Sequence, residues 1–468
     1  MQVPAIISID IGSTWTKGVL FRVDAGGLHL LARRETPTTV HDLATGFAVV
    51  RDDLERAAAA AGLPPPPIRF SSSAKGGLAV VAVGLVPELT LEAAKMAALS
   101  AGAKVVKEFA YKLTAEDLRE IAAIKPDIIL LAGGTDGGNE EYILHNARAL
   151  AAAAVPGVII YAGNRAAAEA SRSLLAGTDA RFAENLFPEF NQLNPEPARA
   201  AIRDVFLRQI IHGKGLDRVV AATGCQPKPT PLAFLELAEA IAGHCPGWEE
   251  FCALDMGGAT TDVYSSHRDD ADEGGGVLRR GLPEPDVKRT VEGDLGMRVS
   301  APAVWEALAG MIRPKLAAAG LSEAVWLAYL DRLAADPGHL PQDAAGQACD
   351  LVLANACVAE ALRRHCGRDR VLYTIDGDRI VRRGKNLSGV KKVIGTGGYL
   401  AHLDSATPMA GVGETAPDRR GETILWPREF EYWIDQDYLL PLLGNLAAEM
   451  PEVAAQAAIA ALRKTIEN

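Results

Sequence analysis

The chain has 468 residues, of which 49% are hydrophobic and 23% charged, a balance typical of a folded globular protein rather than a disordered or fibrous one. Lys and Arg number 48 against 59 Asp and Glu, so the net charge is −11 and no overall basic character indicates a nucleic-acid-binding protein. No apolar run reaches the roughly eighteen residues of a membrane span, and residues 1–10 lack the layout of a signal peptide, so we expect a cytoplasmic protein.

The first predicted unit is a β-strand, a tight turn and a second β-strand. An apolar run at residues 5–9 ends at Asp10, a turn rich in glycine and hydroxyl groups follows, and the apolar strand pattern resumes at residues 19–23. The other elements predicted in this part are a strand at residues 28–35, a helix at 43–61 and, after a proline run, a strand at 68–72.

From about residue 84 onward, helical and strand patterns alternate. Alternation of this kind predicts a parallel sheet with helices on its faces. The predicted elements are a helix at residues 91–102, a strand at 105–111, a helix at 114–124 capped by Thr114, and strands at 128–132 and 158–162. The glycine-rich loop at residues 133–139 lacks the GxGxxG spacing of a dinucleotide site, and we interpret it as a structural or partner-facing turn.

The second half of the chain repeats the first unit. An apolar run at residues 251–254 reaches Asp255, a Gly/Thr turn leads to Asp262, and a strand resumes at 263–265. Two copies of one motif predict two similar lobes that face each other. The other elements predicted here are helices at 232–242, 313–335, 347–365, 438–446 and 453–466, strands at 371–375, 379–383 and 391–394, a glycine turn at 395–398 before a helix start at 399, and an exposed acidic hairpin tip at 269–276.

Two such hairpins could together hold a triphosphate. Glycine lets the backbone approach a phosphate closely, and turn amides and hydroxyl groups donate hydrogen bonds to it. Asp10 and Asp255, at the strand ends, could hold hydrated Mg²⁺, which accepts one or two carboxylates and completes its shell with water and phosphate oxygens. The candidate nucleotide-binding residues are Gly12, Ser13, Thr14, Lys17, Gly257, Gly258, Thr260 and Thr261, with Gly395, Gly397 and Gly398 beside the adenosine.

Three carboxylates are the candidate catalytic residues, Asp10, Asp255 and Asp262. For Asp262 two roles stay open, orientation of a water molecule and stabilisation of the turn. Lys17 could reach a phosphate as a point charge or point to solvent from the second strand.

These motifs resemble those of the actin, Hsp70 and sugar kinase superfamily of ATPases. Residues 10–17 look like its first phosphate motif, 255–262 like the second and 393–398 like the adenosine motif. Pro229-Thr230-Pro231 and the following helix are similar to the first connecting helix between the lobes, and residues 438–446 to the second. The resemblance implies an α/β fold of two actin-like ATPase lobes with ATP and Mg²⁺ in the cleft between them.

Further runs resemble one subfamily, the glutamate mutase accessory proteins called GlmL or MutL, which are unrelated to the mismatch-repair protein of the latter name. These runs are residues 71–77, 83–90, 131–139 and 291–297. The resemblance implies an ATP-dependent accessory or reactivating protein whose partners are the subunits of an adenosylcobalamin-dependent mutase or aminomutase.

The expected division of the chain follows from the motifs and the change of pattern near residue 84. Residues 1–83 plus 223–245 are assigned to the first lobe, 84–222 to an α/β subdomain inserted in it, 246–430 to the second lobe and 431–468 to closing helices.

One residue departs from the superfamily pattern. Hsp70-like members have a carboxylate before the Pro-Thr of the connecting segment, whereas this chain has Lys228, and a cation cannot act as a general base. Hydrolysis is then expected to be slow or to be assisted by Glu292 or Asp294, for which a solvated acidic turn is the alternative interpretation.

Other interpretations of function stay open. A small-molecule kinase would use the same cleft, and a relative that binds nucleotide without turnover would share the fold. An activator of 2-hydroxyacyl-CoA dehydratases would need an iron–sulfur cluster, but Cys349, Cys357 and Cys366 fall on a helical pattern, and the six cysteines include no CxxC pair.

The basic run at residues 379–392 is interpreted as a solvated face, with an acidic protein partner as the alternative. The aromatic residues Trp426, Tyr432, Trp433 and Tyr438 are expected to pack on the second lobe.

Overall fold

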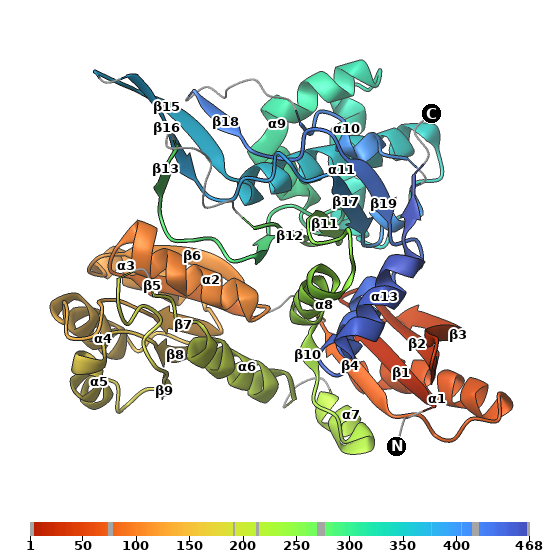
Figure 1. Cartoon of the computed structure of the whole chain (residues 1–468), viewed down its shortest axis with the longest axis horizontal. Helices are drawn as coiled ribbons and strands as arrows, with labels where there is room; N and C mark the ends of the chain where they lie inside the picture. Colours follow the sequence, from red (N-terminus) through yellow and green to blue (C-terminus); the bar gives the residue numbers. More distant parts are fainter. Residues whose placement is uncertain are drawn as a thin grey trace.

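The computed structural model describes residues 4–73, 78–190, 192–211, 215–268, 277–375, 377–403, 405–413 and 421–465. Figure 1 shows three groups of elements, with the second lobe above and the first lobe and the insert side by side below. The helices α8 (Thr230–His244) and α13 (Pro451–Ala461) lie between the upper and lower groups (Figure 1). No helix among the described residues is long and apolar enough to cross a membrane.

The first lobe is built on a five-stranded sheet in the order β10-β4-β1-β2-β3. Its strands are β1 (Ala5–Ile11), β2 (Trp15–Asp24), β3 (Gly27–Pro37), β4 (Ile68–Ser72) and β10 (Lys228–Pro229). Helix α1 (Leu43–Ala60) packs on this sheet because its apolar residues recur at helical spacing on one face, at Phe47, Val50 and Leu54.

The second lobe repeats the pairing of the first. Its sheet has the order β14-β12-β11-β17-β19-β20, with β11 antiparallel to β12 and parallel to β17, as β1 is antiparallel to β2 and parallel to β4. The strands are β11 (Phe251–Met256), β12 (Thr261–Ser266), β14 (Val287–Glu292), β17 (Lys392–Thr396), β19 (Glu431–Ile434) and β20 (Arg463–Lys464). The structure therefore confirms the predicted α/β class and the predicted repeat.

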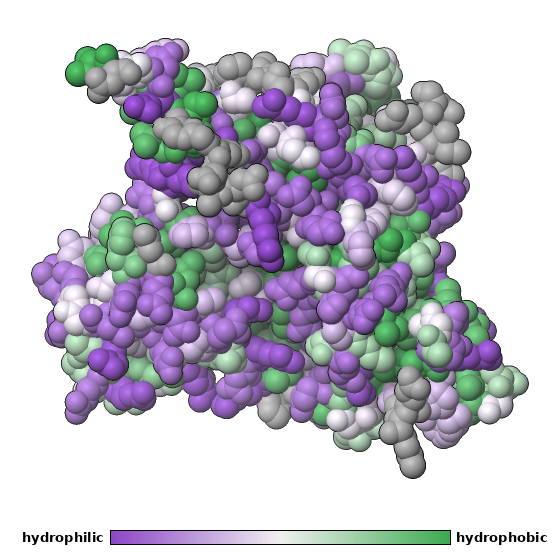
Figure 2. Space-filling model, viewed as in Figure 1, coloured by the Kyte–Doolittle hydropathy of each residue, from purple (hydrophilic) through white to green (hydrophobic). Residues whose placement is uncertain are grey.

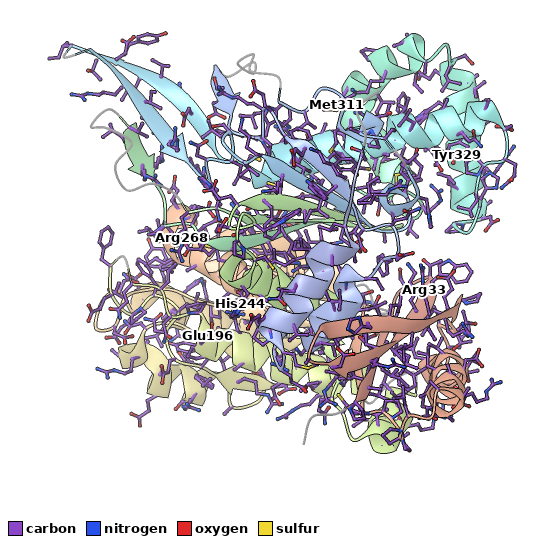
Figure 3. All side chains as sticks on the ribbon, turned by 45° about the vertical axis from the view of Figure 1, so that its right-hand side comes forward. Arg33, Glu196, His244, Arg268, Met311 and Tyr329 are labelled. Carbon is purple, nitrogen blue, oxygen red and sulfur yellow. The ribbon has the colours of Figure 1, made fainter. Side chains whose placement is uncertain are left out.

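Three helices of the second lobe join β14 to the later strands. They are α9 (Ala301–Ala318), α10 (Glu323–Ala335) and α11 (Ala344–His365), and the one-turn helices η3 (Leu400–His402) and η4 (Thr407–Met409) follow β17. The single helix predicted at residues 313–335 is wrong. Gly320 adopts a positive φ of 68° and ends the first helix, and the Ser322 side chain caps the second by accepting from the amide of Val325. Figure 3 labels Met311 on α9 and Tyr329 on α10, on either side of this break.

The insert has a sheet in which all neighbouring strands are parallel, as predicted. The order is β6-β5-β7-β8-β9, with β5 (Ala79–Gly84), β6 (Lys104–Ala110), β7 (Ile128–Leu131), β8 (Val158–Tyr161) and β9 (Ala180–Phe182). Its helical elements are η1 (Pro87–Leu91), α2 (Glu92–Ser100), α3 (Ala115–Ile124), α4 (Glu141–Ala153), η2 (Arg165–Ala167), α5 (Ala168–Leu174), α6 (Glu196–Ile211) and α7 (Leu216–Thr223). Thr114 caps α3 in a capping box with Asp117, which confirms the predicted start.

A fourth, small sheet projects from the second lobe at the upper left of Figure 1. Its order is β13-β16-β15-β18, with β13 (Val277–Arg280), β15 (Arg368–Thr374), β16 (Gly377–Arg383) and β18 (Glu422–Ile424). Figure 2 shows both hydrophobic and hydrophilic residues on the projecting hairpin. The end of the hairpin is open to solvent, as the exposure of Tyr373 and Ile375 shows.

The connecting helices hold the two lobes together. Helix α12 (Leu440–Ala447) crosses α8 so closely that a Cβ on Gly444 would lie 2.4 Å from the carbonyl oxygen of Ala233. The Ser8 hydroxyl of β1 donates to the carbonyl of Leu442 at 2.6 Å. One core of buried residues, which includes Phe234, unites these helices with strands of both sheets.

The predicted division into lobes and insert stays a prediction, although sheet membership differs from it at two places. Strand β5, not predicted, pairs within the insert sheet, and β19 and β20 belong to the sheet of the second lobe. The helix expected at residues 453–466 ends at Ala461, and the helix expected from Tyr399 is one short turn. The acidic tip at 269–276 lies outside the described residues.

Candidate nucleotide-binding site

The two repeated hairpins have the same turn. The amide of Gly12 donates to the carbonyl of Trp15 at 3.0 Å, and the amide of Gly257 donates to the carbonyl of Thr260 at 2.9 Å. A Cβ on Gly12 would lie 2.7 Å from the Trp15 oxygen, so the first turn requires glycine. The two hairpin turns are thus equivalent in position and in hydrogen bonding.

Both turns line one cavity of about 200 Å³. The structure brings together there most of the predicted site residues, namely Asp10, Gly12, Ser13, Thr14, Lys17, Asp255, Gly257, Gly258, Thr260, Asp262, Gly397 and Gly398. Two predicted residues do not line it. The Thr261 hydroxyl is buried and donates to the carbonyl of Leu295 at 2.9 Å, and Gly395 allows close packing of Tyr432, whose hydroxyl oxygen would lie 1.9 Å from a Cβ there.

Asp10 is buried at the end of β1 and accepts two hydroxyl hydrogen bonds. Ser71 donates from β4 at 2.8 Å, and Thr230 donates from the start of α8 at 2.6 Å. Burial raises the pKa of Asp10, while the two hydroxyl groups and the Lys17 ammonium oppose that shift. Thr230 is not among the predicted site residues, because the Pro-Thr-Pro run predicts only the start of a connecting helix.

The Thr230→Val substitution removes one of these donors from a buried carboxylate. We expect a loss of about 1–3 kcal/mol in the free energy of unfolding. We also expect the rate of Mg²⁺-dependent ATP hydrolysis to fall more than the affinity for ATP. Urea unfolding and phosphate release measure the two effects, and Thr223→Val, which removes a hydroxyl from α7, is the control. Equal effects of both substitutions would contradict a special role for Thr230.

Asp255 occupies the equivalent position at the end of β11. It is half-buried and faces the cavity, and its carboxylate has no hydrogen bond or ion pair with the residues that the structure describes. Burial raises the pKa of Asp255 to about 7, and the nearby carboxylates of Asp262 and Asp10 add to the shift. A carboxyl group with this pKa can exchange a proton near neutral pH.

Lys17 lies across from Asp10 on β2 and lines the cavity instead of pointing to solvent. Its ammonium nitrogen lies 3.4 Å from the centroid of the Tyr438 ring. Burial lowers the pKa of Lys17, and the carboxylates of Asp10 and Asp255 oppose that shift. Tyr438 therefore belongs to the cavity, whereas Tyr432 packs in the core of the second lobe as predicted.

A residue not predicted, Asp435, fixes the segment that carries Tyr438. Its buried carboxylate accepts from the amides of Leu439 and Leu440 at 2.7 and 3.1 Å, and from the Thr396 hydroxyl at 2.8 Å. These bonds hold the start of α12 against the end of β17.

Asp262, opposite Asp255 on β12, forms a buried ion pair. The Arg289 guanidinium of β14 donates to its carboxylate at 2.6 and 2.8 Å. The same guanidinium donates to the carbonyls of Leu99 at 2.7 Å and Ala103 at 3.0 Å, at the end of α2 in the insert. Asp262 is thus engaged in an ion pair with the neighbouring strand, and both of its predicted roles stay predictions.

The alternative bases considered in place of Lys228 are engaged elsewhere. Glu292 and Asp294 both accept from the Arg364 guanidinium at 2.8 Å, and neither lines the cavity. Lys228 itself pairs with Glu236 of α8. Asp255 is thus the carboxylate best placed to act on a water molecule in the cavity.

The donor set fits Mg²⁺ that keeps part of its water shell. Among the described residues, no group of three or more His, Cys, Asp or Glu side chains could hold a metal ion by itself. Asp10 and Asp255 would supply two oxygen ligands in a cavity with three carboxylates, and Mg²⁺ characteristically combines such a pair with water and phosphate oxygens.

Comparison with known proteins assigns the family. A model of the MutL protein family matches residues 6–462. The chain is 38% identical over 461 residues to Protein MutL of Clostridium tetanomorphum, covering 96% of this chain and 97% of that protein. The chain belongs to the MutL protein family. The resemblance inferred from the sequence motifs is thereby confirmed.

Solved structures similar to this MutL family member include two sugar kinases. One is a ROK hexokinase of Thermus thermophilus, with 12% sequence identity, coverage of 97% of this chain and 99% of that chain, and a TM-score of 0.30. The other is a xylulose kinase of Bifidobacterium adolescentis, with 10% sequence identity, coverage of 99% of this chain and 94% of that chain, and a TM-score of 0.31. A diol dehydratase-reactivating factor has 11% identity, covers 80% and 79%, and has a TM-score of 0.23. These TM-scores are too low to support an argument about function.

The cysteines disfavour the dehydratase-activator alternative. Cys349 and Cys357 of α11 and Cys366 beside it are buried in the core of the second lobe. Burial raises the pKa of Cys349 to about 11 and that of Cys357 to about 12, so the thiolate that binds iron is disfavoured. A cluster shared between two subunits would need cysteines at the surface.

Proposed function

We propose that this protein binds ATP with Mg²⁺ between its two hairpins and hydrolyses it as an accessory protein of an adenosylcobalamin-dependent mutase, such as glutamate mutase or an aminomutase. The observation that carries the proposal is the pair of equivalent hairpins with Asp10 and Asp255 at their strand ends. Membership of the MutL family supports the mutase as partner.

Each part of the cavity has a role in this proposal. The amides and hydroxyl groups of residues 13–14 and 258–260 would donate to the phosphates, and Lys17 would supply a positive charge. Gly398, where a Cβ would meet nothing within 4 Å, leaves room for the adenosine beside the backbone, and Gly397 lets this turn pack on the backbone of Met256. Asp10 and Asp255 would hold hydrated Mg²⁺, which neutralises phosphate charge, and the ionised form of Asp255, in contact with the metal only through water, would accept a proton from the attacking water.

We infer that nucleotide turnover drives a change in the arrangement of the lobes. ATP in the cavity would contact both hairpins, so its hydrolysis would loosen their closure. The insert would sense this change, because Arg289 of the second lobe donates to the carbonyls at the end of α2, and Lys104 of the insert donates to the carbonyl of Gly293.

The Gly258→Val substitution tests the ATP site. Gly258 lines the cavity and a Cβ there would lie 3.4 Å from the Cβ of Arg298, an ordinary contact, so the fold is expected to tolerate a side chain. The branched side chain would occupy the place of a phosphate, and we expect ATP affinity to fall at least about 100-fold in calorimetric titration, roughly 3 kcal/mol.

The matched control is Gly177→Val, at a position in the insert where a Cβ would meet nothing within 4 Å. It should leave ATP affinity unchanged. A folded Gly258→Val protein that still binds ATP normally would remove the second hairpin from the proposed site.

A further inference from the structure

A second cavity, a groove of about 550 Å³, adjoins the candidate nucleotide site. It lies between the insert helices α2 and α6, helix α8 and the small sheet β13-β16-β15. Arg289 lines both cavities, so one buried side chain separates the groove from the phosphate hairpins. Nine basic and five acidic side chains line the groove, although the net charge of the chain is −11.

The sheet wall of the groove carries a row of arginines. Arg280 of β13 pairs with Arg383 of β16, which in turn pairs with Arg368 of β15, so three like charges stand side by side across three strands. Arg370 lies two residues beyond Arg368 and therefore on the same face. Like charges directly opposite each other in a sheet are destabilising, and such a row needs anions nearby.

Among the described residues, ion pairs form at the outer members of this row, and Glu422 of β18 also lies directly opposite Arg370 in the strand register. Arg280 pairs with Glu88 of the insert at 2.7 Å, and Arg368 pairs with Glu422 of β18 at 3.2 Å. Arg383, in the middle of the row, and Arg370 are exposed and have no ion-pair partner within the described ranges. The described residues thus leave the Arg383 guanidinium, and in part that of Arg370, open to bind a carboxylate.

The opposite wall carries partly exposed apolar side chains, Met96 of α2 and Leu193 just before α6, with the buried Leu99 and Leu235 behind them. It also carries Glu92 and Glu239, and burial raises the pKa of Glu239, which favours its neutral form. A small free anion would leave this apolar surface exposed to water. A peptide segment that combines acidic and apolar side chains would cover the apolar wall and neutralise the arginines together.

We propose that this groove docks an acidic, partly apolar segment of the partner protein. The identity of that partner as a mutase rests on the function proposed above, but the docking chemistry does not. Because Arg289 lies between the groove and Asp262, a segment bound in the groove would change the balance of lobe arrangements that the nucleotide also changes, and the two ligands would affect each other by linkage.

The test uses the full chain and a fluorescein-labelled peptide of fourteen residues. In this peptide, two Glu residues followed by one Leu are repeated along the sequence. We expect the peptide to bind in fluorescence anisotropy, with an affinity that falls at least tenfold in the double variant Arg370→Glu/Arg383→Glu. A double variant with Lys at both positions should keep most of the affinity, and a peptide with Lys in place of Glu should not bind. ATP affinity should be unchanged in both variants, since neither arginine lines the nucleotide cavity.

The matched control is Arg56→Glu/Arg119→Glu, which reverses two exposed arginines that do not line the groove. It should bind the peptide as the unchanged chain does. No binding of the acidic peptide, or equal binding by all variants, would overturn the proposal. Binding of inorganic polyphosphate without binding of the peptide would also overturn the proposal, and it would indicate a site for free anions. Failure of ATP to bind, with peptide binding intact, would instead refute the proposed function.

Discussion

Asp255→Asn is expected to lower the rate of Mg²⁺-dependent ATP hydrolysis at least about 100-fold, because it removes both a carboxylate that holds the hydrated metal and the proposed base. The same substitution should stabilise the protein without nucleotide at pH 8. The pKa of Asp255 is about 7 in the folded chain, against about 4 in an unfolded one, so the folded state binds more protons between these values. Ionised Asp255 therefore costs stability as the pH rises from about 4 to 7.

At pH 8, the substitution is expected to raise the free energy of unfolding by about 1–3 kcal/mol. This is less than the whole pKa shift of Asp255 would give, because the side chain is half-buried, and the gain should disappear near pH 4. Phosphate release and thermal unfolding at the two pH values measure these effects. Asp24→Asn, at the exposed end of β2, is the control and should leave turnover unchanged. A variant that keeps more than a tenth of the turnover would contradict the role assigned to Asp255.

Arg289→Met should destabilise the chain by about 3–5 kcal/mol, because it leaves the Asp262 carboxylate buried without its counter-charge. It also frees the carbonyls of Leu99 and Ala103, which lose their donor. Urea unfolding measures the loss. Adding Asp262→Asn to this variant should recover part of the stability, since the uncompensated charge is then absent.

The matched comparison is Arg313→Met, which breaks an exposed ion pair with Glu323 and should cost less than about 1 kcal/mol. If Arg289→Met is no more destabilising than this control, or if Asp262→Asn gives no recovery, the buried Asp262–Arg289 pair does not stabilise the chain as described.

The parts of the site that could be predicted from the sequence are the local ones. Gly12 and Gly257 belong to tight turns whose hydrogen bonds close within four residues, and such turns leave a clear pattern of glycine between two apolar strands. Asp10 and Asp255 follow directly from the same pattern. The repeat of the pattern also predicted the matching sheets of the two lobes.

The parts that could not be predicted depend on contacts between distant segments. Thr230 is 220 residues from Asp10, and Arg289 is 190 residues from Leu99, so no local pattern indicates their roles. The hydroxyl-rich turn motif predicts Thr261 at the phosphates, but Thr261 begins β12 and its side chain is buried. Sequence pattern also missed β5, because a short apolar run is equally compatible with helix and strand.

The insert is not packed as an independent unit, because it shares a hydrophobic core with the first lobe. One hydrophobic core includes Ile7 and Ile9 of β1 together with Val80 of β5 and Ala94 of α2. Removal of residues 84–222 would therefore expose part of the core of the first lobe. Single substitutions at the groove and at Arg289 are better tests of partner coupling than deletion of the insert.

The most direct test of the proposed function measures ATP hydrolysis with glutamate mutase whose adenosylcobalamin has been inactivated. Binding of the inactive mutase should favour one arrangement of the lobes, and by linkage it should change nucleotide turnover. We predict a rate of phosphate release at least about fivefold above the basal rate, and no effect of sugars or small carboxylic acids. An unchanged rate with the mutase, together with a phosphorylated sugar or acid as product, would contradict the account and identify a small-molecule kinase.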